Sequence, residues 1–391
     1  MMVYIVQWPG GALSGDLLRA KVVGMESTGR KRKTLASLAA ELGVSRTTVS
    51  NAYNRPDQLA PATRERILAA AAKRGYPGPD PTARSLRTRR AGAIGVLLTE
   101  RLTYAFEDKA SVDFLAGMAE ASYGTNASLT LIPAGPDTAN ETSRAQELLG
   151  RAAVDGFVVY SVAKNDPYLE AAMQRGLPLV VCDQPTDTGL PFVGIDDYAA
   201  IKPAAQALVD AGHRKIGVMA IRLMHERADG AVNPCELEAA AMHVQRNRIQ
   251  GALDVFEDAG IERETIPVHT RHINDRTNGR EASAQLLGAH PDLTAVLCTT
   301  DSMALALIDY AQEIGMRVPE DLSVTGFDGV DTAVARGLST VVQPNKSKGA
   351  AAGQLLQELI EKDGELADKR ERKILPTSFH PGATIAPPRF A

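Results

Sequence analysis

The chain has 391 residues, of which 44% are hydrophobic and 23% are charged, and this length and composition are typical of a globular protein with two or three domains. No stretch reaches the roughly 18 apolar residues that cross a bilayer, and the first residues show no secretion signal, so we expect a cytoplasmic protein that does not contact membranes. The cysteines, Cys182, Cys235 and Cys298, lie far apart in the sequence, which predicts free thiols and no metal site or other cofactor.

The net charge of −4 conceals two segments of opposite charge. Residues 26–90 contain 14 Lys and Arg against 5 Asp and Glu, whereas residues 91–391 contain 27 against 41. A basic segment next to an acidic one indicates that one end of the protein meets a polyanion such as nucleic acid. A basic segment that is merely solvated is the alternative interpretation.

The first 33 residues are predicted to be a disordered extension, because several glycines interrupt any helical pattern there. In the following domain, residues 34–80, apolar residues at helical spacing predict three short helices. The first ends at Gly43, and the second begins after Ser45, whose hydroxyl can cap it. The third begins at Pro61, because the fixed φ of proline suits a first helical turn.

Residues 34–54 have the pattern of a helix–turn–helix. The second helix has an apolar inner stripe and leaves a polar face near its N-terminus, where side chains can reach base edges in the major groove of DNA. The polar residues of this segment that we expect at a DNA interface are Thr34, Ser45, Arg46, Thr47, Ser50 and Asn51.

From residue 91 onward, apolar runs of strand length alternate with amphipathic helical stretches. Such alternation predicts parallel sheets covered by helices on both faces, and two doubly wound α/β lobes are favoured over one large sheet. Ligands bind such folds at the carboxyl ends of the strands, so we expect a pocket between the lobes. The predicted strands are 93–98, 128–132, 156–160, 177–183, 192–196, 215–221, 294–300 and 322–328.

The sequence from Thr34 through the first predicted strand resembles the start of a member of the LacI/GalR family of bacterial transcription regulators. The resemblance is carried by GVSxxTVSxxxN (43–54), TRERI (63–67), GY (75–76) and PxPxARSLRT (79–88), and it extends along all but the first thirty or so residues. It implies a helix–turn–helix head, a hinge helix over residues 81–90, and a body over 91–391 with the type I periplasmic-binding-protein fold, in which three crossovers join two lobes.

The resemblance also implies roles for DNA-contacting residues. Arg46, Thr47 and Asn51 match the residues that read the major groove. Ala83, Arg84 and Leu86 match the hinge helix, whose leucine inserts into the minor groove and bends the duplex at a cost of a few kcal/mol. Packing within its own domain is the alternative role for Leu86. Ala60 departs from the family, which often has a Ser or Thr cap at this position.

In the body, Arg248, Asp301 and Asp328 match the family's effector contacts. Two carboxylates and a guanidinium at strand ends can pair with vicinal hydroxyls or amides. Each residue also has an ordinary structural interpretation: a helix cap for Asp301, a turn for Asp328 and a surface ion pair for Arg248.

A sugar site also calls for an aromatic face. Trp8 is the single tryptophan and lies outside the body. The aromatic candidates in the body, for which plain core packing is equally open, are Tyr104, Phe106, Tyr160 and Phe327. Gln343 is a further candidate contact.

We therefore predict a sequence-specific regulator of transcription, acting as a repressor. It binds double-stranded operator DNA as a homodimer, is nucleoid-associated when bound, and is controlled by a small-molecule effector such as a sugar or sugar derivative. Induction and corepression both remain open. The stretch 224–245 is expected to be a polar surface insertion.

Two other classes are disfavoured. An enzyme would need catalytic residues, but we find no GxGxxG, GxxxxGK[ST], GxSxG or HExxH motif. The histidines are scattered, and His269 and His272 are expected in a polar loop. A secreted solute-binding protein would match the body alone, and the basic helix–turn–helix argues against it.

Overall fold

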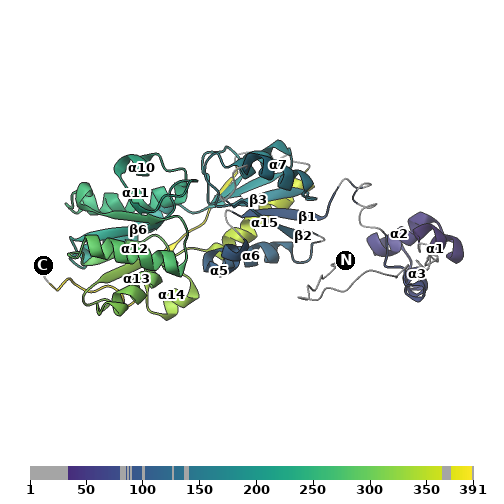
Figure 1. The fold of residues 1–391 in the computed structure, drawn as a ribbon. Coiled ribbons are helices and arrows are strands. Elements are labelled where there is room, and N and C mark those ends of the chain that lie inside the picture. Colours follow the sequence, from purple (N-terminus) through teal and green to yellow (C-terminus); the bar gives the residue numbers. More distant parts are fainter. Residues whose placement is uncertain are drawn as a thin grey trace, which may run out of the picture. The chain divides into compact units, whose positions relative to one another are not determined.

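The computed structural model describes residues 34–79, 85, 88, 90–98, 102–125, 127–135, 141–362 and 371–389. The chain divides between residues 84 and 85 into two compact units (Figure 1). The predicted N-terminal extension and the hinge residues Ala83, Arg84 and Leu86 lie outside the described residues. Within the described part of the chain, no helix combines the length and the apolar character needed to span a membrane.

The first unit is a small helical domain with its own apolar core. Its helices are α1 (Leu35–Leu42), α2 (Arg46–Asn54), the 3-10 turn η1 (Pro56–Gln58) and α3 (Pro61–Arg74). Leu38, Val49 and Ile67 contribute one buried side chain from each α-helix, so the three helices pack on one centre.

The helix ends agree with the predicted caps. Gly43 follows α1 with φ +64°, a left-handed conformation that glycine adopts without strain. The Ser45 hydroxyl accepts a hydrogen bond from the Thr48 N–H at 2.9 Å. Ala60 has no polar side chain with which to cap α3, and Pro61 fills the first helical position.

The second unit contains two sheets, each with helices on both faces. In the described residues, sheet A has the order β12-β5-β4-β3-β1-β2 and all of its pairings are parallel. We call sheet A with its helices lobe 1. Its strands are β1 (Ala93–Leu98), β2 (Ser128–Pro133), β3 (Gly156–Tyr160), β4 (Leu179–Cys182), β5 (Phe192–Gly194) and β12 (Arg372–Ile374). Its helices are α5 (Leu102–Glu107), α6 (Lys109–Ser122), α7 (Glu141–Arg151), α8 (Pro167–Gln174) and α15 (Asn345–Glu361).

Sheet B has the order β13-β11-β10-β9-β6-β8-β7, with antiparallel strands at its two described edges. We call sheet B with its helices lobe 2. Its strands are β6 (Ile216–Ile221), β7 (Gly230–Ala231), β8 (Val268–Arg271), β9 (Ala295–Cys298), β10 (Ser323–Asp328), β11 (Ser339–Val342) and β13 (Ser378–His380). Its helices are α9 (Asp197–Asp210), α10 (Pro234–Glu238), α11 (His243–Asp258), the 3-10 turn η2 (Arg263–Thr265), α12 (Arg276–Ala289), α13 (Asp301–Glu313) and α14 (Asp331–Ala335).

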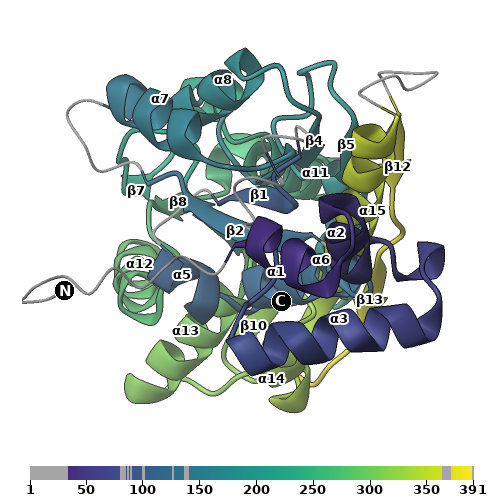
Figure 2. The same cartoon turned by 90° about the vertical axis from the view of Figure 1, so that its right-hand side faces the viewer.

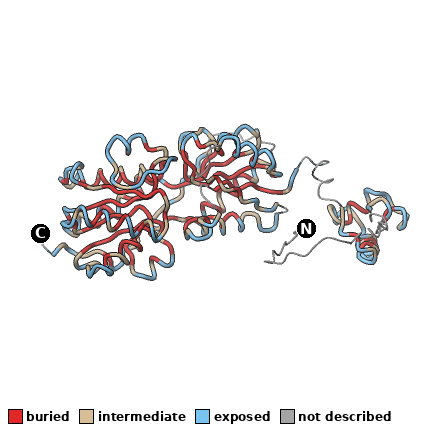
Figure 3. Tube along the Cα trace, in the orientation of Figure 1, coloured by how far each residue is buried: buried red, intermediate tan, exposed pale blue. Residues whose placement is uncertain are grey.

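Helices cover both faces of each sheet (Figure 1, Figure 2). In lobe 1, α6 and α15 pack on one face and α7 and α8 on the other. In lobe 2, α9 and α11 oppose α12 and α13. Buried residues consequently follow the central strands of both sheets (Figure 3), as continuous apolar strands require.

The two lobes repeat one topology. The order β2-β1-β3-β4-β5 in lobe 1 matches β8-β6-β9-β10-β11 in lobe 2, so each sheet has a switch point beside its first strand. The described chain crosses between the lobes after β5, after β11 and between β12 and β13. This topology confirms the predicted fold of two doubly wound lobes joined by three crossovers.

One prediction about loops was wrong and another holds in part. His269 lies on strand β8 and is buried, because β6 and β7 pair with the two edges of that strand. The stretch 224–245, predicted as a polar surface insertion, is mostly exposed as far as Ala239, although it includes β7 and α10. Its last residues, Val244 and Gln245, belong to α11 and are buried.

Candidate functional site

A cavity of about 60 Å³ lies where the carboxyl ends of the strands of both lobes meet. Lobe 1 contributes Tyr104, Asp108, Tyr160 and Asp183 to its lining. Lobe 2 contributes Arg222, Gln245, Arg248, Asn274, Thr300 and Asp328, and Gln343 comes from the crossover after β11. Small-molecule sites usually measure about 300–1,000 Å³. The lobes are therefore closed around a space smaller than such a ligand needs.

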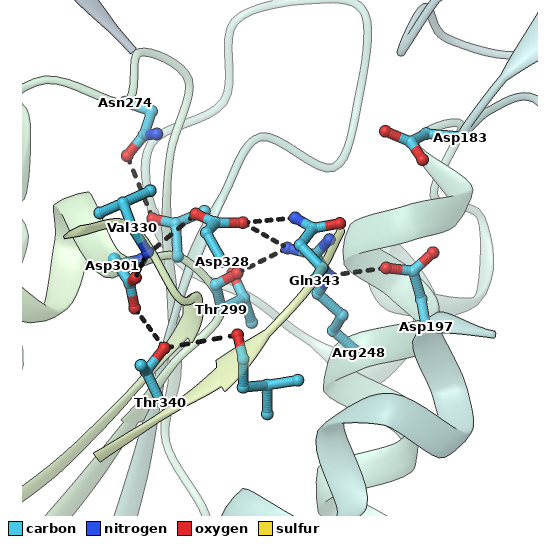
Figure 4. A network of polar contacts seen from close by, with 12 residues as sticks. Asp183, Asp197, Arg248, Asn274, Thr299, Asp301, Asp328, Val330, Thr340 and Gln343 are labelled. Atoms are coloured by element: carbon cyan, nitrogen blue, oxygen red, sulfur yellow. Dashed lines mark hydrogen bonds and ion pairs between the residues drawn. The ribbon is translucent and has the colours of Figure 1, made fainter. Parts of the chain in front are cut away.

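Arg248 is the central cation of the cavity wall (Figure 4). It lies on α11 and is only 5% exposed. Its Nε donates to Oδ1 of Asp197 at 2.8 Å, and its Nη1 donates to the Thr299 carbonyl at 2.8 Å. The same Nη1 lies 3.7 Å from Oδ1 of Asp328. Arg248 is thus buried and held from three sides, and the alternative of a surface ion pair is wrong.

Asp328 ends β10 in an unusual backbone conformation. Its φ is +123°, a region that costs free energy for a residue other than glycine. Its Oδ1 accepts a hydrogen bond from Nε2 of Gln343 at 2.6 Å. Burial raises the pKa of Asp328 well above its ordinary value, although Arg248 acts in the opposite direction. The strand end therefore presents a buried carboxyl group to the cavity.

Asp301 is not among the described residues that line the cavity. Its Oδ2 accepts from the Val330 N–H at 2.9 Å and its Oδ1 from the Thr340 hydroxyl at 2.5 Å. Burial raises the pKa of Asp301 to about 7, while these hydrogen bonds lower it. Its carboxyl group thus accepts hydrogen bonds inside lobe 2 and does not line the cavity, which corrects the prediction of a direct effector contact.

Two of the aromatic candidates line the cavity and two do not. The Tyr104 hydroxyl of lobe 1 accepts a hydrogen bond from Nδ2 of Asn274 in lobe 2 at 3.2 Å. The ring of Tyr160 stacks on Phe114, with centroids 3.9 Å apart. Phe327 is fully buried in the core of lobe 2, and Phe106 is 62% exposed on α5. Neither Phe327 nor Phe106 belongs to the described lining, and the core position of Phe327 corrects its prediction as a direct contact.

The most important residues that the sequence prediction missed are Asp183 and Lys348. Asp183 follows β4 with φ +68° and lines the cavity, as Asp328 does at the end of β10. The position of Asp183 directly after a buried strand was a usable signal. Nothing in the local sequence of Lys348 indicates its role, because its partner Asp183 is 165 residues away.

Direct contacts between the lobes surround the cavity. Oε1 of Gln184 in lobe 1 accepts from the Val244 N–H of lobe 2 at 2.8 Å. Nε2 of His225 in lobe 2 lies 2.7 Å from Oε2 of Glu141 at the start of α7. These two contacts join lobe 1 directly to lobe 2.

The helical domain presents a smaller polar face than predicted. Arg46 and Thr47 are exposed at the start of α2, and Asn51 is partly exposed. Ser50 is buried, and its hydroxyl accepts from Nδ2 of Asn54 at 3.1 Å. The prediction of Ser50 at the interface is therefore corrected.

The hydroxyls of Ser45 and Thr34 cap helices. The Thr34 hydroxyl accepts from the Ser37 N–H at 3.2 Å, in the capping box that starts α1. Of the residues predicted at the interface, Arg46 and Thr47 keep exposed side chains on α2, and Nδ2 of the partly exposed Asn51 donates to Oε1 of Gln58 at 3.4 Å.

Known proteins resemble the chain in both units. Residues 34–78 match the model of bacterial regulatory proteins of the lacI family, and residues 205–385 match a periplasmic binding protein-like domain. The HTH-type transcriptional regulator IpsA of Corynebacterium glutamicum is 56% identical over 362 residues, which cover 92% of this chain and 99% of that protein.

Solved structures give the same result. A LacI family transcriptional regulator from Corynebacterium glutamicum is 51% identical, with a TM-score of 0.71, and the match covers 91% of this chain and 100% of that one. A complex of the transcriptional regulator CelR with cellobiose is 26% identical, with a TM-score of 0.65, over 90% of this chain and 100% of that one. The chain therefore belongs to the LacI family of bacterial regulatory proteins and is a DNA-binding transcriptional regulator, not an enzyme.

Proposed function

We propose that the protein is a repressor that binds an operator as a homodimer and is controlled by a sugar or sugar derivative in the cavity between the lobes. The observation that carries this proposal is the set of buried polar side chains at the carboxyl ends of both sheets. Arg248 and Asp328 from lobe 2 face Asp183 and Tyr160 from lobe 1 across the cavity.

This lining suits a ligand with several hydroxyl groups. Carboxylates such as Asp183 accept hydrogen bonds from hydroxyls, and a guanidinium such as Arg248 donates to their oxygens. The rings of Tyr104 and Tyr160 add the aromatic surface that sugar sites often have. The complex of CelR with cellobiose, a relative with the same fold, supports a saccharide as the class of effector.

The ligand acts through the lobes. Because the closed cavity measures about 60 Å³, a sugar enters only when the lobes move apart. A ligand shifts such an equilibrium by the difference between its affinities for the two arrangements. Contacts such as those of Gln184 with Val244 and of His225 with Glu141 set the free energy of the closed arrangement that the ligand must overcome.

The DNA end of the mechanism uses two elements. Arg46, Thr47 and Asn51 on α2 are the proposed major-groove contacts, one set for each half of an inverted repeat. Ala83, Arg84 and Leu86 are the proposed hinge contacts in the minor groove. Asp301, Phe106 and Phe327 are not part of the proposed effector site.

A combined binding experiment tests this function. We expect the full chain to bind double-stranded DNA with an affinity that falls steeply with salt. In a thermal-shift screen that includes cellobiose and ribose, at least one saccharide should raise the melting temperature and alter the binding of the duplex. A protein that ignores the duplex at low salt, or that responds to no saccharide, contradicts the proposal.

A further inference from the structure

A lysine side chain is completely buried behind the wall of the cavity. Lys348 lies in the first turn of α15 and is 0% exposed. Lysine is rarely buried to this extent without a partner. The helix does not favour a cation there either, because the N-terminal end of a helix is itself positive. The position is therefore explained by partners outside the helix.

The partners of Lys348 are two residues that line the cavity. Its Nζ donates to Oδ1 and Oδ2 of Asp183 at 2.9 and 2.8 Å, and to Oε1 of Gln343 at 2.7 Å. An ammonium group has three N–H donors and no acceptor, so these contacts use its full capacity. Lys348 itself is not among the described residues of the lining. Its direct contacts with the cavity lining are those with Asp183 and Gln343.

The contact with Lys348 fixes the orientation of the Gln343 amide. Because an ammonium can only donate, the atom of Gln343 that faces it must be the oxygen. The amide nitrogen is then turned toward Asp328, to which it donates at 2.6 Å (Figure 4). A chain of hydrogen bonds thus runs from Asp183 in lobe 1 through Lys348 and Gln343 to Asp328 in lobe 2.

The backbone of Lys348 has little freedom to move. Its neighbour Gly349 lies so close to α6 that a Cβ atom there would overlap the carbonyl oxygen of Phe114. Gly117 on α6 makes the reciprocal approach to the carbonyl oxygen of Lys346. This close packing of α6 on α15 holds the ammonium group in place.

The charge of Lys348 also reaches other acids near the cavity. Burial raises the pKa of Asp108 and of Asp197, and the positive charge of Lys348 partly opposes the rise at both carboxyl groups. Asp108 lines the cavity beside Tyr104. The electrostatic influence of the lysine therefore extends beyond its direct partners.

We propose that Lys348 is a positioning residue for ligand recognition. It keeps Asp183 as an anionic acceptor in lobe 1 and turns the Gln343 amide to hold Asp328 in lobe 2. An ionised Asp183 accepts hydrogen bonds from neutral hydroxyls and repels anionic ligands, so Lys348 helps select neutral polyhydroxylated compounds. The statement about ligands rests on the proposed effector site, whereas the statement about Asp183 and Gln343 does not.

The first test needs no ligand and uses the full chain. K348M has a side chain of similar length without the charge. K346M is the matched control, because Lys346 lies two residues away on the same helix and forms an exposed ion pair with Glu120 at 2.6 Å. In protein with ¹³C-labelled aspartate, the carboxyl signal of Asp183 is identified by its absence in D183N. This signal should move in K348M and stay in place in K346M, because only K348M removes the direct partner of the carboxylate. A signal that stays in place in K348M overturns the proposal.

The double variant D183N/K348M covers the case in which K348M does not fold. Removing both charges avoids an unpaired buried ion and should preserve the fold. In this variant the ¹⁵N signal of the Gln343 side-chain amide should move relative to the wild type and K346M. A signal that stays in place overturns the proposal.

The second test measures recognition. The readout is the saccharide concentration that gives half of the full effect on DNA binding, measured with cellobiose or with whichever saccharide acts on the wild type. This concentration should rise at least about tenfold in D183N/K348M, because a charge-assisted hydrogen bond is lost. It should stay unchanged in K346M. A double variant that responds like the wild type overturns the role of Lys348. A wild type that responds to no saccharide rejects the proposed function instead, and the carboxyl signal of Asp183 in K348M still decides the positioning role.

Discussion

The guanidinium carbon of Arg248 lies 3.6 Å from the centre of the Phe327 ring. Phe327 is fully buried in the core of lobe 2, and Arg248 lines the cavity. The aromatic residue that the sequence suggested as a ligand contact thus supports Arg248, a proposed ligand contact. A cation held over a ring face in a dry environment gains about 1–2 kcal/mol, and here that contact fixes one face of the guanidinium.

Replacing the supporting ring should therefore affect both stability and recognition. We expect F327L to lower the free energy of unfolding by about 2–4 kcal/mol, because it loses the cation–π contact and leaves a cavity. The saccharide concentration needed for a thermal shift should also rise, because Arg248 loses its orientation. Urea denaturation and thermal-shift titration measure the two effects.

Phe256 provides the control for F327L. It is fully buried in the same core cluster, on the face of sheet B that α11 covers. F256L should destabilise the protein by loss of packing and leave the saccharide response of the folded protein unchanged. If F327L and F256L respond to saccharides alike, the ring has no role in orienting Arg248.

The buried carboxyl group of Asp301 predicts a pH dependence of stability. Burial raises its pKa from 3.8 to about 7. A group whose pKa is higher in the folded state stabilises the protein fully at pH values below its unfolded pKa, and this contribution is lost as the pH rises through the folded pKa. The melting temperature should therefore fall between about pH 4 and about pH 7. Asp197, with a pKa raised by burial to about 6, adds to the same trend.

D301N should reduce the slope of melting temperature against pH, because an amide stays neutral at every pH in this range. The variant should also lose about 1–3 kcal/mol at low pH, since one acceptor of the pair used by Val330 and Thr340 becomes a donor. D292N, at an exposed position paired with Lys215, is the control and should keep the wild-type slope. Melting curves across the pH range decide this, and equal slopes for D301N and the wild type would refute the assignment.

The sequence predicted the fold well where hydrophobic period and caps specify it. Strands such as β1 and β3 are continuous apolar runs, and Ser45 and Pro61 mark helix starts by their own chemistry. Strand β8, with the sequence VHTR, was missed because three of its four residues are polar. It is a strand because it pairs with β6 and β7, and such pairing is a tertiary property that a local pattern does not contain.

The site was harder to predict than the fold, because residue types alone do not say where a side chain points. Asp301 and Asp183 both follow a buried strand. The carboxyl group of Asp301 is hydrogen-bonded inside lobe 2, whereas Asp183 lines the cavity. Lys348 reads as one more polar residue on a helix, although it is the partner of Asp183. The direction of each side chain depends on the packing of segments far apart in the sequence.

The structure separates two neighbouring residues of α2 that the sequence placed together. Ser50 is buried and bonded to Asn54, whereas Asn51 is partly exposed. S50A should cost about 0.5–1.5 kcal/mol of stability for the lost hydrogen bond and leave operator affinity nearly unchanged. N51A should weaken specific binding by about 1–3 kcal/mol, the value of a direct base contact. Fluorescence anisotropy on operator and random duplexes distinguishes the two variants. A loss of operator affinity in S50A and not in N51A would mean that Ser50, and not Asn51, contacts the bases.

The hinge offers two substitutions whose effects should differ in kind. Leu86 is proposed to insert between base pairs, which requires a site that bends easily, so L86A should weaken operator binding by a few kcal/mol and leave binding to random duplex almost unchanged. Arg84 is proposed to contact phosphates, which every sequence has. R84A should therefore weaken both kinds of binding and lower the slope of log affinity against log salt by about one. Titrations at several salt concentrations give both quantities. Equal losses on operator and random duplex in L86A would mean that Leu86 packs within its own domain, because only an inserted side chain makes affinity depend on how readily the DNA deforms.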